Sequence, residues 1–160
     1  MADARETGPT DGHRQAPAQR RGPGRAVRLI GLLVALVGVV FVVAGVATYV
    51  VVGTTLSDEN ITVSDDASYF AGDAVKGPFT AYVQADTIAK HAEEIAGGKT
   101  YAELPQDDPN RDAVMTASFL RASLFTSVVA FGVAALVAVL GLVLVALGWA
   151  LRKIGAELTP

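Results

Sequence analysis

Two long blocks without a single Asp, Glu, Lys, Arg or His constrain this chain more than any other feature. They are Leu29–Val52, with 24 residues, and Ala122–Leu151, with 30 residues. As helices they would be about 36 and 45 Å long, whereas the apolar core of a bilayer is about 30 Å thick. Each block is therefore long enough to span a membrane, and a spanning segment satisfies its backbone only as a helix. This pattern excludes a simple soluble globule.

The first block has an alternative interpretation as a cleaved signal peptide. Arg20 and Arg21 precede it, and Gly45-Val46-Ala47 resembles a cleavage site with two small residues. The apolar region of a signal peptide, however, usually has about 7–15 residues, and this block continues to Val52. We therefore expect it to be retained as a membrane anchor.

The charges on either side of the blocks predict an orientation. Residues 1–28 carry six basic and three acidic side chains, whereas residues 53–121 carry five basic and twelve acidic ones. Because basic residues near span ends favour the cytoplasm, we expect both termini inside the plasma membrane and residues 53–121 outside. The expected interface anchors are Arg28, Tyr49, Arg121, Trp149, Arg152 and Lys153.

The predicted fold class is an α-helical membrane protein, a two-helix transmembrane hairpin with a small, mainly helical extracytoplasmic domain. The proline-rich start is too polar to bury a core. Asp108-Pro109 is a good helix start, and no helix breaker follows it before the second block. The predicted segments are a disordered cytoplasmic tail (1–25), a first transmembrane helix (26–52), the extracytoplasmic domain (53–108), a long helix (109–154) that contains the second span at about 123–151, and a cytoplasmic tail (155–160).

The extracytoplasmic segment contains signals for a short extended piece and one helix. Ile61-Thr62-Val63 is the extended candidate. The stretch Thr80–Ala96 has apolar residues at helical spacing after Pro78, and Gly97-Gly98 would end the helix. Without cysteine the domain has no disulfide, so we expect its aromatic side chains to gather against the protruding part of the long helix. They are Tyr69, Phe70, Phe79, Tyr82, Tyr101 and Phe119.

Small residues recur at seven-residue spacing in both blocks. Membrane helices associate where small side chains let their backbones approach, and a seven-residue repeat keeps one stripe on a partner helix. An antiparallel hairpin would bring Gly31 near Gly148, Gly38 near Gly141 and Gly45 near Ala134. The same stripes could instead serve a partner helix or a homodimer. The two stripes are Gly31, Gly38 and Gly45 in the first block and Ser127, Ala134, Gly141 and Gly148 in the second.

The sequence provides little material for catalysis or transport. The spans contain no ionisable residue, which argues against a proton or ion pathway. There is no cysteine, and His13 and His91 are expected on opposite sides of the membrane. His91 with Glu93 and Glu94 could form a partial metal site, but a solvated helix face is the favoured interpretation.

The acidic pairs Asp65-Asp66 and Asp107-Asp108 favour turn and helix-capping roles, because they lack the spacing of a calcium loop. We expect no catalytic residues, no cofactor, no metal and no nucleic-acid surface. The expected partners are the lipid bilayer and either another membrane protein or further copies of this chain.

Three stretches together resemble a family of small actinobacterial two-span membrane proteins. They are residues 91–104 (HAEEIAGGKTYAEL), 107–112 (DDPNRD) and 115–133 (MTASFLRASLFTSVVAFGV), and 77–82 (GPFTAY) also fits. The resemblance covers roughly residues 29–154. Members often carry the label "aromatic ring-opening dioxygenase". We judge the label incorrect for this chain, because such enzymes use a histidine-and-carboxylate iron site and His91 has no second histidine on its expected side of the membrane. The resemblance implies a two-span membrane protein and supplies no site residues.

The leading functional hypothesis is a non-enzymatic accessory or scaffolding component of the cell envelope. The alternative is an extracytoplasmic sensor or small-ligand-binding module that signals through the hairpin. A pocket with converging polar groups would favour the sensor, and a flat apolar patch would favour the scaffold.

Overall fold

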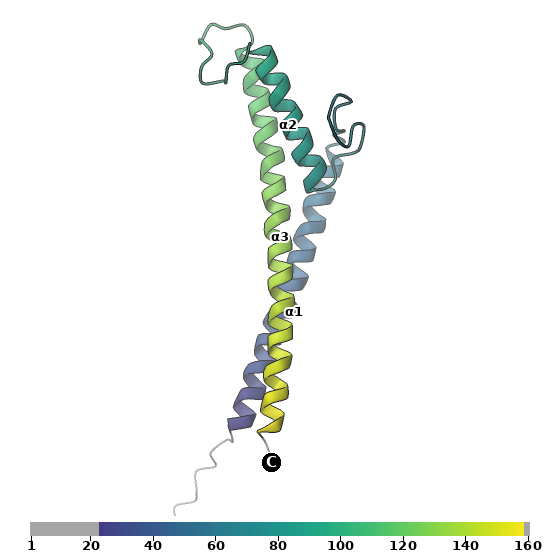
Figure 1. Ribbon diagram of the computed structural model, residues 1–160, viewed down its shortest axis with the longest axis vertical. Helices are drawn as coiled ribbons and strands as arrows, with labels where there is room; N and C mark the ends of the chain where they lie inside the picture. The colour runs from purple at the N-terminus through teal and green to yellow at the C-terminus, as the bar shows by residue number, and fades with distance from the viewer. Residues whose placement is uncertain (1–22, 159–160) are drawn as a thin grey trace, which may run out of the picture.

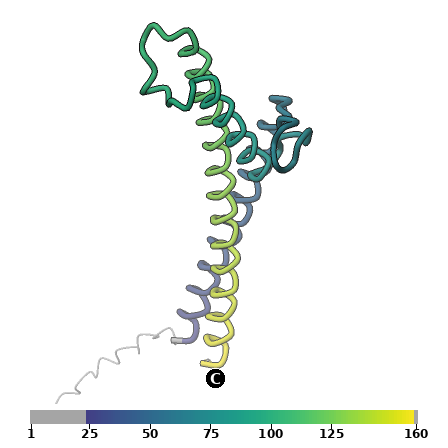
Figure 2. Tube along the Cα trace, turned by 45° about the horizontal axis from the view of Figure 1, so that its top comes forward, coloured from purple at the N-terminus to yellow at the C-terminus, as the bar shows by residue number. Residues whose placement is uncertain are grey.

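The computed structural model describes residues 23–158 and is built from three helices. They are α1 (Pro23–Asp58), α2 (Pro78–Ile95) and α3 (Arg111–Glu157). Helices α1 and α3 form a long antiparallel pair, and α2 packs against the end of α3 that lies away from the chain termini (Figure 1). A view turned by 45° shows the same pair and the same place for α2 (Figure 2).

The long helices exceed their predicted bounds at three of their four ends. Helix α1 begins at Pro23 and continues to Asp58, beyond the predicted 26–52. Helix α3 ends at Glu157, three residues after the predicted Ile154, so the expected cytoplasmic tail is partly helical. The predicted disordered tail was residues 1–25, of which residues 1–22 lie outside the described part of the chain.

Helix α3 starts at Arg111 and not at the predicted Pro109. The Asp108 side chain does not cap the helix, because its Oδ1 accepts a hydrogen bond from the backbone N–H of Asn110 at 2.8 Å. This bond closes a turn, and Asn110 becomes the residue that precedes the helix. The turn role predicted for the acidic pair is thus confirmed for Asp108, whereas its helix-capping role is wrong.

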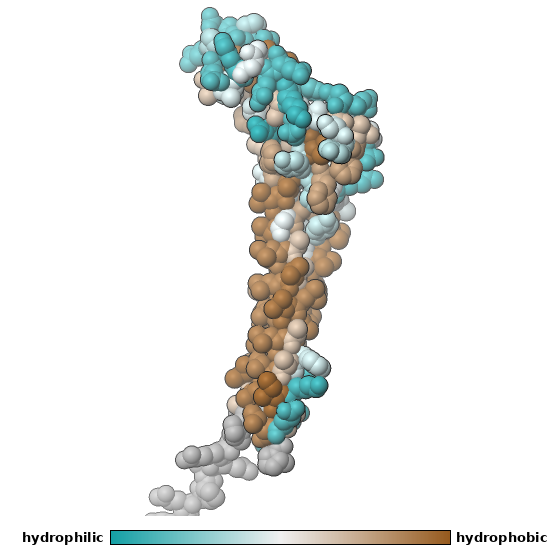
Figure 3. Space-filling view, viewed as in Figure 1, coloured by the Kyte–Doolittle hydropathy of each residue, from teal (hydrophilic) through white to brown (hydrophobic). Residues whose placement is uncertain are grey.

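The paired helices are long and apolar enough to cross a membrane, by length and composition. Their outward-facing Leu and Val side chains are about half exposed. Figure 3 shows this apolar surface as a continuous band along the pair, with hydrophilic residues gathered at the α2 end and a smaller hydrophilic patch near the chain termini. Without lipid around it, such a surface would be strongly unfavourable in water.

We call residues 59–121 the head. Its core is aliphatic and small, with Val63 and Val75 of the loop before α2 each 1% exposed, and Ala81 and Ala85 of α2 fully buried. The loop folds back on itself through backbone hydrogen bonds, including Val63 N to Asp73 O at 2.9 Å. The extended segment predicted at residues 61–63 is present as an isolated antiparallel bridge between Thr62 and Ala74.

Helix α2 ends where the sequence predicts. Its last residue is Ile95, and Gly97 and Gly98 adopt positive φ angles of 64° and 82°. The N–H groups of Gly97 and Gly98 donate to the carbonyls of Glu94 and Glu93. Glycine suits this left-handed turn because it has no Cβ.

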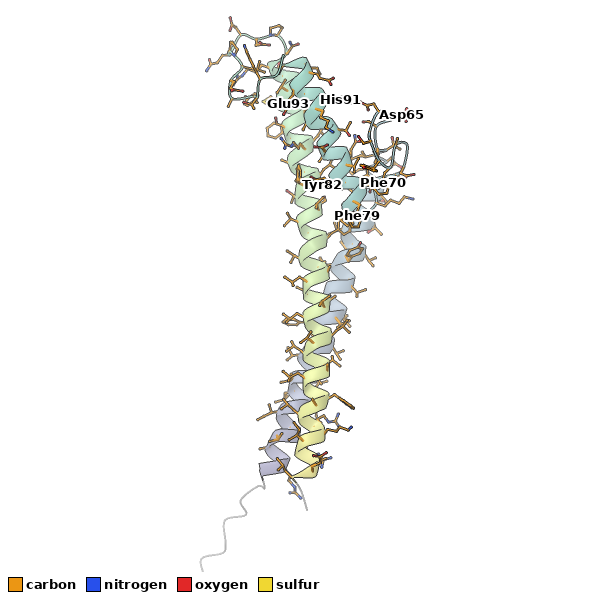
Figure 4. The ribbon with its side chains drawn as sticks, in the orientation of Figure 1. Asp65, Phe70, Phe79, Tyr82, His91 and Glu93 are labelled. Atoms are coloured by element: carbon orange, nitrogen blue, oxygen red, sulfur yellow. The ribbon has the colours of Figure 1, made fainter. Side chains whose placement is uncertain are left out.

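The aromatic cluster predicted for the head is wrong. Phe79 is 76% exposed, and Tyr69 and Phe119 are exposed to a similar degree. Only Tyr101 among the six packs against a buried cluster, that of Ala96, Leu104 and Val114. Figure 4 shows Phe70, Phe79 and Tyr82 at the end of the head that adjoins the long helical pair. The buried contacts of α2 are made by its alanines. Tyr82 remains half exposed and makes an edge contact with Phe125 of α3 at 5.7 Å between ring centroids.

Candidate functional site

Backbone contact between α1 and α3 runs along their small residues. A Cβ added to Gly38 would lie 2.6 Å from Gly141 O, and one added to Gly31 would lie 2.7 Å from Gly148 O. A Cβ on Gly45 would lie 2.6 Å from Ala134 O. The structure thus brings together the three pairs that the seven-residue spacing predicts, within a single chain.

One further pair extends this contact toward the termini. Gly155 lies against Gly24, since a Cβ on Gly155 would lie 2.9 Å from Gly24 O. Sequence analysis missed this pair because Gly24 and Gly155 lie outside the uncharged blocks, although they continue the same spacing. We call the eight residues the glycine seam: Gly24, Gly31, Gly38 and Gly45 of α1 and Ala134, Gly141, Gly148 and Gly155 of α3.

The seam ends before Ser127, the seventh residue of the predicted stripes. The residue of α1 that continues the spacing is Val52, whose branched side chain leaves no room for close backbone contact. Ser127 is half-buried, and its hydroxyl donates to Ser123 O at 3.2 Å within α3. The two helices therefore part at this level.

Phe131 occupies the position where the helices part. Its ring is 1% exposed and makes an edge contact with Tyr49 at 4.8 Å between centroids. Gly53, one turn further along α1, also faces the ring, since an added Cβ would lie 3.8 Å from it. Edge-to-face pairs of this kind are favourable beyond the area they bury.

Beyond Phe131 a groove of about 520 Å³ opens between the three helices. We call it the fork groove. Its walls are mainly apolar, and its volume is in the range of pockets that bind small molecules. It is lined by Val51, Val52, Thr55, Leu56, Glu59, Ile61, Gln84, Ile88, Leu120, Ser123, Leu124, Thr126, Ser127 and Ala130.

Gln84 is the most buried polar side chain in the groove wall. It is 8% exposed, and its Oε1 accepts hydrogen bonds from the Ser64 backbone N–H at 2.9 Å and from the Ser64 hydroxyl at 3.3 Å. The Nε2 atom of Gln84 donates no hydrogen bond to any residue from 23 to 158. Since every fully buried side-chain nitrogen or oxygen of these residues has a partner, Nε2 is not fully buried. Gln84 lines the groove, so this amide can donate to a molecule that occupies it.

The opposite end of the pair is basic. Arg25 and Arg28 of α1 and Arg152 of α3 surround a hollow of about 290 Å³ that is floored by Leu29 and Leu32. No acidic side chain of the described residues forms an ion pair with these arginines. The arrangement has the charge and the apolar floor that an anionic lipid headgroup and its chain would need.

The remaining predicted interface anchors lie at the two ends of the apolar band. Trp149 is exposed, with the Lys153 ammonium 4.9 Å from its ring centroid. The Arg121 guanidinium lies 5.5 Å above the Phe125 ring at the head end. Tyr49 is 41% exposed, and its ring also contacts the Phe131 ring.

Among the titratable residues of the head, His91 and Asp66 make a contact that joins the loop to α2. His91 Nε2 lies 2.6 Å from Asp66 Oδ2, which ties the loop before α2 to the helix; Figure 4 marks His91 and Asp65 on the two facing elements. The hydrogen bond from His91 lowers the pKa of Asp66. Within residues 23–158 no three His, Asp or Glu residues gather in a way that could hold a metal ion. His91 thus meets Asp66 and not the neighbouring glutamates.

The chain matches no family model, no curated protein and no solved structure.

Sequence analysis missed Gln84 and Asp66 as contact residues. Both contacts depend on the loop of residues 59–77 returning to α2, and they join residues 20 and 25 positions apart. The one available signal was compositional, because a glutamine on the otherwise apolar and alanine-rich face of α2 is a polar residue that needs a partner.

Proposed function

We propose that this chain is a two-span integral membrane protein of the plasma membrane, with both termini in the cytoplasm and the head outside. The observation that carries the proposal is the glycine seam. Two helices with uncharged central blocks are joined backbone to backbone and leave nearly all the large apolar side chains of those blocks facing outward. That arrangement suits a lipid surrounding, where close contact between small residues drives helix association. The resemblance to small actinobacterial two-span proteins supports it.

The length of the apolar band suggests where the bilayer lies. If the ring of Trp149 marks the inner edge, a core of about 30 Å covers about 20 residues of α3 and ends near Val129. The glycine seam pairs this level with about Val50 of α1. The helices therefore part at the outer edge of the hydrocarbon core, and the fork groove begins there.

Orientation is tested by labelling in intact cells. The chain has no cysteine of its own, so Ser68→Cys introduces a single thiol in the exposed loop of the head. We expect it to react with a membrane-impermeant maleimide, whereas a cysteine at Glu157 should react only after the cells are permeabilised. The opposite pattern would overturn the proposed orientation.

Within this topology we propose an accessory or scaffolding role without catalysis. The head is carried on α3, which continues as one helix from the span to Arg111. Its large aromatic side chains are exposed, with Phe79, Tyr69 and Phe119 all above two-thirds exposure. Exposed aromatic residues on a rigid support are typical of surfaces that contact other proteins.

In-cell photo-crosslinking tests the scaffolding role. A photoreactive phenylalanine analogue in place of Phe119 should yield a crosslinked product with another membrane protein, identified by mass spectrometry. The same analogue at Val139, which faces outward from the span, is the control for lipid-facing positions. If the Phe119 product is absent and the protein purifies as a monomer in mild detergent, the scaffolding role is excluded.

The fork groove favours a second candidate, an extracytoplasmic ligand-binding module that signals through the hairpin. Its apolar walls with a few polar groups have the make-up of a small-molecule site. A ligand there would contact all three helices at the level where α1 and α3 part, so it could alter their separation. This candidate predicts that the spacing between labels on α1 and α3 changes when the groove is filled.

A further inference from the structure

We propose that the fork groove holds one acyl chain of an outer-leaflet phospholipid whose headgroup carries an ammonium group. The inference rests on the proposed membrane topology and assigns a ligand class to the groove. It is drawn from three observations: the level of the groove, the chemistry of its walls and the polar groups at its upper end.

The apolar walls of the groove extend above the hydrocarbon core, to a height that the lipid chains of an ordinary bilayer do not reach. Its lower end is at Val51 and Ala130, near the expected outer edge of the hydrocarbon core. From Ala130 to Leu120 the groove rises along α3 by about 15 Å. Its upper part therefore lies at and above the headgroup layer, where unfilled apolar walls would face water at a free-energy cost that grows with their area.

The walls suit a flexible hydrocarbon chain. Leu56, Ile88, Leu120 and Leu124 supply the apolar surface, from all three helices. Two of the four hydroxyl groups at the groove are satisfied within α3: Thr126 donates to Ala122 O at 2.8 Å and Ser127 to Ser123 O. These hydroxyls consequently do not demand a polar ligand in the lower part of the groove. Its lower end adjoins the lipid region, so a chain can enter sideways from the leaflet.

The upper end of the groove carries one donor and one carboxylate. The Gln84 amide nitrogen is accessible there while its oxygen is held by Ser64, and it can donate to a phosphate or ester oxygen. Glu59 is exposed and also lines the groove, and its carboxylate attracts an ammonium group. This pairing fits phosphatidylethanolamine and disfavours an anionic headgroup, which Glu59 would repel.

Fluorescence quenching by brominated lipids tests the proposal on the full chain in vesicles. Because the natural chain lacks cysteine, Ser123→Cys places a single fluorophore in the groove. Ala122→Cys is the matched control, since it lies at the same height but about 100° away around α3 and does not line the groove. Val43→Cys, exposed in the middle of the span, reports membrane insertion. The probe is phosphatidylethanolamine with brominated acyl chains in phosphatidylcholine vesicles.

We expect the fluorescence losses at positions 123 and 43 to be comparable and that at position 122 to be several-fold smaller. Brominated phosphatidylglycerol at the same mole fraction should quench position 123 less. Gln84→Glu keeps an acceptor oxygen for the Ser64 N–H but removes the amide donor, and it should reduce quenching at 123 while leaving that at 43 unchanged.

Each alternative gives a different result. Quenching at 43 but not at 123 would overturn the lipid proposal and leave the two-span topology standing. Loss of quenching at both positions would contradict the topology itself. Equal quenching by the two headgroups would overturn the headgroup assignment. A disulfide between two chains of unlabelled Ser123→Cys under oxidising conditions, together with no quenching of the labelled protein, would assign the groove to a second copy and overturn the lipid proposal.

Discussion

Arg111 connects the second loop of the head to the start of α3. Its guanidinium donates to the carbonyls of Tyr101, Leu104 and Pro105 and lies 4.2 Å above the Tyr101 ring. All three bonds come from Nη1, while the flat face of the same guanidinium lies over the ring, a combination that suits the planar side chain of arginine. Arg111 therefore ties the loop that precedes it to the first turn of the long helix, whose start follows the turn that Asp108 closes.

Replacing Arg111 with alanine is expected to lower the free energy of local unfolding of residues 96–110 by about 1.5 kcal/mol. That is the lower end of the range for hydrogen bonds to charged groups, as suits a half-buried side chain. Because 1.4 kcal/mol is a tenfold change in an equilibrium, limited proteolysis of the loop should accelerate about tenfold. Lys99→Ala, in the same loop, is the control and should leave the rate unchanged. Equal rates for both variants would contradict the assignment.

The contact between His91 and Asp66 predicts an acid-sensitive attachment of the first loop. The folded-state pKa of Asp66 is lowered, chiefly by the hydrogen bond from His91. Its stabilising contribution is thus present above the pKa of the unfolded chain and is lost as the pH falls through the lowered folded value. His91→Ala should raise the pKa of Asp66 toward its ordinary value, as measured by NMR titration of the side-chain carboxyl.

A matched control for this titration is Glu94→Ala, which removes a neighbouring charge of α2 without breaking the contact. An Asp66 titration that is the same in the wild type and in His91→Ala would show that the hydrogen bond does not form in solution.

At the scale of elements, the glycine seam makes the packing of α1 on α3 intolerant of even one methyl group. Gly38→Ala would place a Cβ within 2.6 Å of Gly141 O, so the helices would have to separate. We expect the free energy of unfolding to fall by about 1–3 kcal/mol, as for other overpacked sites. Gly132→Ala, on α3, meets no atom within 4 Å and should be neutral or slightly stabilising.

Unfolding in detergent micelles, followed by circular dichroism, measures this difference. Gly38→Leu should weaken the pairing further than Gly38→Ala does. If Gly38→Ala and Gly132→Ala unfold alike, the seam does not hold the two helices together within one chain.

The long helices and their contact could be predicted from sequence, and the head in large part could not. An uncharged block forms a helix in lipid, and a seven-residue repeat of small residues marks the face by which such a helix can pair with another. The head depends on contacts between distant residues, such as Ser64 with Gln84. Its aromatic residues misled the prediction because large apolar side chains are usually buried, whereas α2 approaches α3 through Ala81 and Ala85.

At the scale of the whole molecule, charge is separated along the axis of the pair. The end near the termini presents Arg25, Arg28, Arg152 and Lys153, with Glu157 as the acidic residue of that end among those described. The head carries the acidic excess. A molecule with this distribution has a preferred direction in any membrane whose inner leaflet is anionic.

Neutralising Arg25, Arg28 and Arg152 together with glutamine should reduce retention of anionic phospholipid by purified protein. Each arginine near an anionic surface contributes about 1 kcal/mol, so the effect should be large at low salt and shrink as ionic strength rises. Native mass spectrometry of bound phosphatidylglycerol measures it. The control changes Lys76, Lys90 and Lys99 of the head to glutamine. Equal lipid loss in both triple variants would show that the basic hollow has no special role.

The periodicity of the glycine seam leaves the register of the hairpin open to a slip by one repeat. If α3 moved by seven residues, Gly31 would face Gly141 and Gly38 would face Ala134, and both contacts would again join small residues. Phe131 removes this degeneracy. In the slipped arrangement its ring would meet Val42 and Val46 in place of Tyr49 and Gly53, and Val46 has a branched side chain where Gly53 leaves space. One phenylalanine and one glycine at the outer end thus favour the observed alignment over this slipped one.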